Sequence, residues 1–137
     1  MSSALQKLHA SHADRLGLGP HAARLFQELQ IAARHNLWAS TIILSATIID
    51  VLRHEDVMFD LEESDDGLSY GEVEAGGYDY LPYADRKKLN EIRKLRNSLV
   101  HYEGAVEGMM GQKTDEGYLR QQADKAASLL MMILQDH

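Results

Sequence analysis

Apolar residues recur three and four positions apart along most of this chain, the spacing that places side chains on one face of a helix. The pattern predicts helices over residues 3–16, 20–36, 82–103 and 115–134. Pro20 separates the first two, because proline cannot continue a helix but is favourable as the first residue of the next. The clearest apolar stripe lies in the third of these helices and consists of Leu89, Ile92, Leu95 and Leu99.

Residues 37–59 allow two interpretations. The β-branched runs 41–43 and 47–51 favour a strand. However, no glycine or proline interrupts the segment, and Trp38, Ile42 and Ile49 keep a helical period. We interpret the segment as a central helix that is apolar nearly all round, with packing overriding its β propensity.

Residues 60–81 combine acidic side chains, tyrosines and glycines and are predicted to form a loop. This is longer than most connections inside a domain, which predicts that the loop is functional, mobile or both. The length of 137 residues fits one domain, residues 1–137. The expected fold is therefore an all-α, up-and-down bundle of four to five helices.

The charge pattern changes this picture locally. A net charge of −7 argues against a protein that coats nucleic acid. Acidic residues gather in 55–79, however, and basic residues gather directly afterwards in 86–96. An acidic total can therefore conceal a basic surface, although both runs also fit ordinary solvated faces.

Composition excludes several kinds of site and compartment. The chain has no cysteine, so disulfides and thiolate metal sites are excluded. No histidine motif typical of zinc occurs, and neither a metal nor a cofactor is predicted. The longest apolar stretch, 37–52, is too short and too polar to span a bilayer, and the first residues do not resemble a signal peptide. We expect a cytoplasmic protein that does not associate with membranes.

Residues 96–101 carry the candidate chemistry. Arginine offers a permanent charge and a forked set of donors to a phosphate, and histidine titrates near neutrality and can transfer protons. Arg96 and His101 are five residues apart, which is about 140° of rotation on an ideal helix. They can converge if the helix ends or distorts between them, or if two copies of the chain face each other. Gly104 soon afterwards is consistent with a helix that ends here.

The segment from Leu95 to His101 resembles the R-x4-H motif of HEPN domains, in the form with asparagine after the arginine. The long amphipathic helix before it, the earlier apolar helix, the variable loop and the closing helix are also similar to the HEPN layout. The resemblance implies a homodimer in which two motifs line one cleft. Many HEPN domains are metal-independent endoribonucleases, often toxins or anti-phage or stress effectors. Others have lost catalysis and serve as interaction modules.

This resemblance implies roles for particular residues. Arg96 and His101 of both subunits would be catalytic, with RNA as substrate and its 2′-hydroxyl as nucleophile. Asn97 and Ser98 would supply supporting hydrogen bonds. Arg93 and Lys94 would contact the RNA backbone.

Two further residues have alternative interpretations. HEPN domains often keep a polar or acidic residue on the earlier helix, and Asp50 occupies such a place; it would orient Arg96 or His101. Alternatively, Asp50 faces water or pairs with Arg53 or His54. Tyr102 either stacks on a base or packs at the end of the bundle, and packing is the favoured interpretation.

One departure from the family pattern concerns subtype. Some HEPN toxins carry R-x4-H-x-Y, with a tyrosine that a partner enzyme modifies with nucleotides. Here that position is Glu103, and the tyrosine is the immediate neighbour Tyr102. The nucleotidyl-modified toxin–antitoxin subtype is therefore in doubt, although an antitoxin or other protein partner stays possible.

Three hypotheses follow. The first is a dimeric HEPN ribonuclease. The second is a non-catalytic helical module that binds protein or RNA, in which the Arg96–His101 pair stabilises the bundle and the acidic loop contacts a partner. The third is an unrelated four-helix bundle in which the motif is a coincidence. Under the first, the acidic loop would be able to cover the basic cleft and inhibit it.

Overall fold

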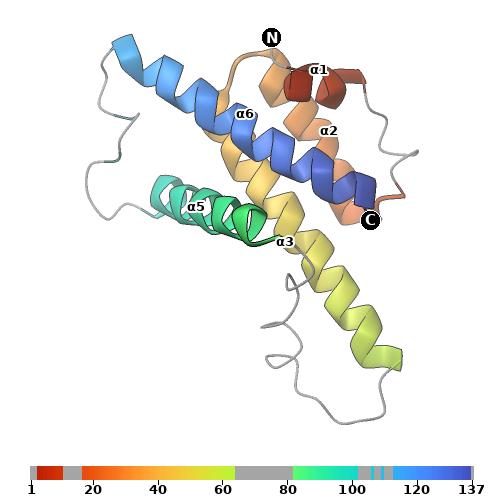
Figure 1. The fold of residues 1–137 in the computed structure, drawn as a ribbon. Coiled ribbons are helices and arrows are strands. Elements are labelled where there is room, and N and C mark those ends of the chain that lie inside the picture. The colour runs from red at the N-terminus through yellow and green to blue at the C-terminus, as the bar shows by residue number, and fades with distance from the viewer. Residues whose placement is uncertain are drawn as a thin grey trace.

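The structure is a computed structural model and describes residues 3–10, 17–63, 82–101, 106, 109 and 113–136. These residues form five helices and no strand, so the predicted all-α class is confirmed (Figure 1). The helices are α1 (Ser3–Ala10), α2 (Pro20–Arg34), α3 (Trp38–Glu63), α5 (Tyr83–Val100) and α6 (Lys113–Asp136). Residues 11–16 of the predicted first helix and residues 64–81 of the predicted loop lie outside the described residues.

The segment with competing strand and helix signals is helical, as expected. Two of its polar β-branched residues are accommodated by bonds within the helix: the hydroxyls of Thr41 and Thr47 donate to the carbonyls four residues earlier, at 2.9 and 2.7 Å. The helix continues to Glu63 instead of ending near residue 59. Residues 60–63 are Asp, Leu, Glu and Glu, of which leucine and glutamate favour helices, and the first glycine comes only at Gly67.

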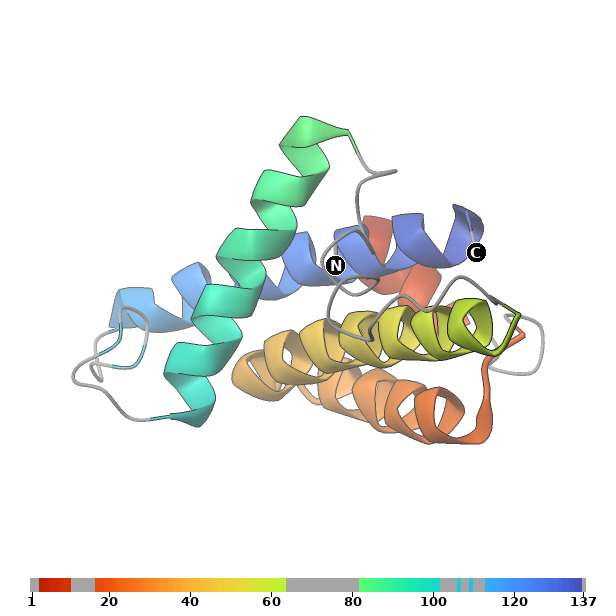
Figure 2. The same ribbon diagram turned by 90° about the horizontal axis from the view of Figure 1, so that it is seen from below.

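A short turn joins α2 to α3. The Leu37 N–H donates to the Ala32 carbonyl at 2.9 Å, and Asn36 adopts a φ of +61°, a conformation that asparagine tolerates better than most residues. In both ribbon views α2 and α3 lie side by side, with α6 across them (Figure 2).

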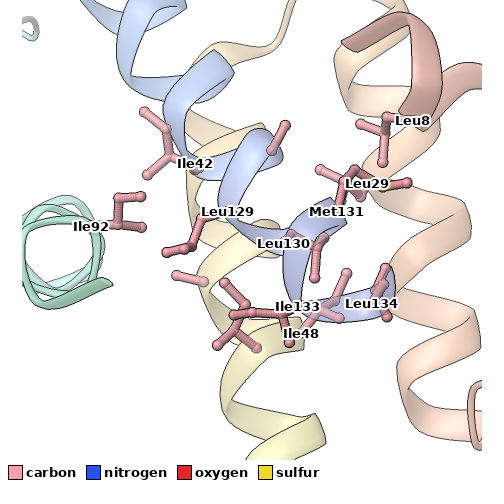
Figure 3. Close-up of a cluster of buried hydrophobic side chains, with 14 of the residues drawn as sticks. Leu8, Leu29, Ile42, Ile48, Ile92, Leu129, Leu130, Met131, Ile133 and Leu134 are labelled. Carbon is pink, nitrogen blue, oxygen red and sulfur yellow. The ribbon is translucent and has the colours of Figure 1, made fainter. Parts of the chain in front are cut away.

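The apolar core is built around α3, which packs against α2, α5 and α6, while α1 covers α6 and α2. Figure 3 shows that all five helices contribute side chains to this core. Its largest fully buried members are Phe26, Leu5, Leu8, Leu29, Ile42, Ile48, Ile49, Ile92 and Leu130. Helix α5 contributes two buried side chains, Leu89 and Ile92, and its Leu95 and Leu99 pack against the core.

None of the described helices combines the length and the apolar character that crossing a membrane requires.

Candidate functional site

Asp50 on α3 and Arg96 on α5 form a direct ion pair. The Arg96 guanidinium donates to Asp50 Oδ2 at 2.8 Å, and the two side chains are 18% and 16% exposed. A hydrogen bond between two charged groups in a half-buried setting is among the stronger polar contacts in proteins. Asp50 follows the fully buried Ile48 and Ile49, so its charge requires such a partner. Asp50 therefore contacts Arg96, one of the two motif residues that it was expected to orient.

Asn97 holds the same arginine from a second direction. The Arg96 Nε donates to Asn97 Oδ1 at 3.1 Å. The asparagine directly after the motif arginine thus restrains the arginine side chain. Two of the Arg96 donors are used inside the chain.

Arg93 also approaches Asp50, one helical turn before Arg96. Its Nε lies 3.4 Å from Asp50 Oδ1, and its side chain is 31% exposed. Among the described residues, however, neither Arg93 Nε nor Asp50 Oδ1 has a hydrogen-bond partner, although both atoms are buried. The Arg93–Asp50 contact is therefore electrostatic only. Sequence reasoning missed it, although the spacing of three residues from Arg96 places both arginines on one face of the helix.

Two other predicted residues have been placed. Lys94 is exposed on α5. The Ser98 hydroxyl donates to the Lys94 carbonyl at 3.0 Å, so its proton is engaged by the helix backbone. In this arrangement Ser98 can offer a substrate only an acceptor.

His101 marks the end of α5. Its N–H donates to the Asn97 carbonyl at 2.8 Å, while its own φ and ψ, −113° and 110°, are extended. Of the alternatives considered, the helix therefore ends between the two motif residues, three residues earlier than the predicted bound of 103. The imidazole is exposed, and within the described part of the chain it has no hydrogen bond or ion pair. Arg96 contacts α3 and His101 faces solvent, so one chain does not join them. Tyr102 lies outside the described residues.

A second ion pair links α5 to α6 beside the motif. Lys125 Nζ donates to Glu91 Oε2 at 2.9 Å. The hydrogen bond and the charge of Lys125, with smaller contributions from Lys87 and Lys94, lower the pKa of Glu91 below its usual 4.5. Glu91 is therefore surrounded by the positive charges of three lysines.

Among residues 3–10, 17–63, 82–101, 106, 109 and 113–136 there is no group of three histidine or carboxylate side chains that is able to hold a metal ion. Comparison with known proteins adds no relative: no family model, no curated protein and no solved structure matches the chain.

Proposed function

We propose that this protein is a HEPN-type, metal-independent endoribonuclease that acts as a homodimer in the cytoplasm. The observation that carries the proposal is the arrangement of α5: Asp50 holds Arg96 at the side of the helix, and His101 emerges exposed where the helix ends. A held cation close in sequence to an imidazole that has no hydrogen bond or ion pair among the described residues fits the needs of phosphodiester cleavage. The Asp50 contact also matches the acidic residue that HEPN domains often keep on the earlier helix.

The reaction requires two proton transfers. One imidazole removes the proton of the 2′-hydroxyl, whose oxygen then attacks the adjacent phosphorus. The P–O5′ bond breaks, a second imidazole protonates the leaving oxygen, and the products are a 2′,3′-cyclic phosphate and a 5′-hydroxyl. Arg96 supplies positive charge beside the phosphate, and Lys94 attracts the RNA backbone.

A second copy of the chain completes this proposed site. Each chain has one motif histidine, and its Arg96 is directed toward α3. Two imidazoles in one cleft therefore require two motifs that face each other. Val100, directly before His101, is 51% exposed and would lie at such an interface.

The test is incubation of end-labelled RNA with the protein in a metal chelator. We expect cleavage by the wild type and a loss of about 100-fold or more in Arg96→Ala and His101→Ala. Arg34→Ala and His35→Ala are matched controls, because both remove an exposed side chain of the same type from α2 or its end. Equal traces of cleavage in wild type and motif variants would refute the nuclease.

Dimerisation has its own measurement. Light scattering on the eluting protein should give twice the chain mass, and Val100→Asp should shift it toward the mass of one chain. A wild type that stays monomeric at micromolar concentration, yet cuts RNA, would remove the shared cleft from the proposal.

A non-catalytic helical module is the second candidate, and one observation favours it. Two donors of Arg96 are already used within the chain, as a purely structural arginine would use them. Under this alternative, Arg96→Ala lowers the melting temperature strongly, while the wild type neither binds nor cuts RNA. Roles as a toxin or an anti-phage effector, with an antitoxin or another protein as partner, belong to the nuclease proposal and depend on it.

A further inference from the structure

Two guanidinium groups share one carboxylate between α3 and α5. Arg93 and Arg96 both lie within 3.4 Å of Asp50 oxygens, so the cluster of these three residues carries one positive charge in excess. All three side chains are less than a third exposed, and water therefore screens this charge less than it screens a surface lysine. Such a cluster attracts an anion.

The two arginines are engaged to different extents. Arg96 donates to Asp50 at 2.8 Å and to Asn97 at 3.1 Å, with its side chain 18% exposed. Arg93 has only its contact of 3.4 Å, is 31% exposed, and has no other interaction within the described residues. The excess charge and the unused donors therefore belong mainly to Arg93.

The Arg93–Asp50 contact is also left incomplete on both sides. Arg93 Nε and Asp50 Oδ1 are buried and face each other without a hydrogen bond among the described residues. Arg93 Nε is out of reach of a ligand, but the side chain is 31% exposed, so a ligand that offers acceptors would approach the other N–H groups of the guanidinium. Arginine binds phosphate oxygens through two parallel hydrogen bonds, which no contact of Arg93 provides at present.

We infer that Arg93 binds a phosphate of the RNA strand next to the one that is cut, and that Asp50 competes with this phosphate for Arg93. The inference rests on the proposed function for the identity of the ligand. Asp50 then has two effects: it holds Arg96 in position, and it weakens the binding of RNA by partly neutralising Arg93. Losing the carboxylate would tighten RNA binding while it impairs cleavage.

The test measures binding to a short RNA in which every 2′-hydroxyl is methylated, because this probe keeps the phosphates but cannot be cut. Arg93→Ala should weaken binding about tenfold and lower the slope of log affinity against log salt by about one. Arg34→Ala, which removes one exposed arginine from α2, should weaken binding less than about twofold. Asp50→Asn should tighten binding by about threefold, and adding Arg93→Ala should abolish that gain.

Thermal melts accompany each variant, and Arg93→Lys replaces Arg93→Ala if the latter does not fold. Lysine keeps the charge but loses the fork, so it should bind with intermediate affinity and a salt slope close to that of wild type. Equal binding by Arg93 and Arg34 variants would overturn the inference, as would a wild type that does not bind the probe. If the protein binds the methylated RNA but does not cleave the unmethylated RNA, the nuclease alone is refuted. If the protein cleaves RNA and Arg93→Ala binds the methylated RNA as tightly as the wild type, the inference alone is refuted.

Discussion

Helix α3 meets its neighbours through two kinds of surface. Ile48 and Ile49 belong to the apolar cluster that includes Leu29 of α2 and Leu130 of α6 (Figure 3). The very next residue, Asp50, forms ion pairs with α5. Successive residues of a helix point about 100° apart, so one helix is able to serve both surfaces.

The apolar surface and the ion pairs of α3 contribute differently to the stability of the bundle. Burial of aliphatic side chains is the dominant favourable contribution to folding. A half-buried ion pair must first lose its hydration, and apolar replacements of similar size are often equally stable or more stable. We therefore interpret the polar contact of α5 as serving function, with the stability of the fold carried by the apolar surface.

The largest expected effect is on the apolar surface. Leu130→Ala should lower the free energy of unfolding by about 2–5 kcal/mol, because it removes a fully buried side chain and leaves a cavity. Urea denaturation measures this, and cleavage per folded molecule should not change. Leu37→Ala is the control, since this leucine is 52% exposed and should cost less than about 0.5 kcal/mol. If both variants lost the same free energy of unfolding, burial in the core would not be what stabilises the fold.

A smaller loss is expected from the polar surface. Asp50→Ala should lower the free energy of unfolding by about 1–3 kcal/mol, because it leaves Arg96 half-buried without its carboxylate. The double variant Asp50→Leu with Arg96→Met should be more stable than Asp50→Ala, and it should lack all cleavage. A double variant as unstable as the single one would mean that the ion pair is needed for folding.

A third contact, distant in sequence from the motif, has a weaker effect. The Arg120 guanidinium lies 5.9 Å from the centre of the Trp38 ring, a cation–π arrangement between α6 and the start of α3. Arg120→Gln should cost about 0.5–1 kcal/mol in thermal or urea unfolding. Gln121→Ala is the neighbouring exposed control on α6. If Arg120→Gln cost as much free energy of unfolding as Asp50→Ala, the cation–π contact would stabilise the fold as much as the Asp50–Arg96 ion pair does.

The smallest effect concerns pH and the pair between Glu91 and Lys125. Because the folded pKa of Glu91 lies below 4.5, the pair stabilises the fold above that pH and ceases to do so as pH falls through the lower folded value. Glu91→Gln should therefore lower the melting temperature slightly near neutral pH and leave it unchanged in acid. Because Glu91 is exposed, added salt should also reduce the difference. A deficit that persists in acid would show that the glutamine itself disrupts packing.

Much of the fold was predictable because it depends on local pattern. Absence of glycine and proline decided the helical state of α3 despite its β-branched runs, and the hydroxyl bonds of Thr41 and Thr47 explain why its polar residues are tolerated. The end of α3 was less predictable, since the helix-favouring Leu61, Glu62 and Glu63 are followed by acidic and glycine residues that are typical of a loop. Boundaries of this kind depend on weak, competing preferences.

The site was predictable only in part, for a different reason. A carboxylate on an apolar helix requires a partner, but Arg96 and Arg93 are more than forty residues away, and only the packing of α5 on α3 brings them to Asp50. Helix α5 ends at Val100, three residues before the predicted end near residue 103, because Gly104 was the only local signal for where it stops. Within one chain Arg96 contacts α3 and His101 is exposed, and the proposed meeting of two motifs in a dimer is not specified by any pattern within one chain.

The most direct test of the nuclease is the chemistry of its product ends. RNA incubated with the wild type in chelator should yield fragments that end in 2′,3′-cyclic phosphate, measured by mass spectrometry, and His101→Ala should yield none. A single 2′-deoxy substitution at the cut position should abolish cleavage there, because the nucleophile is missing. Fragments with 3′-hydroxyl ends, cleavage at the deoxy position, or no fragments at all would contradict the account.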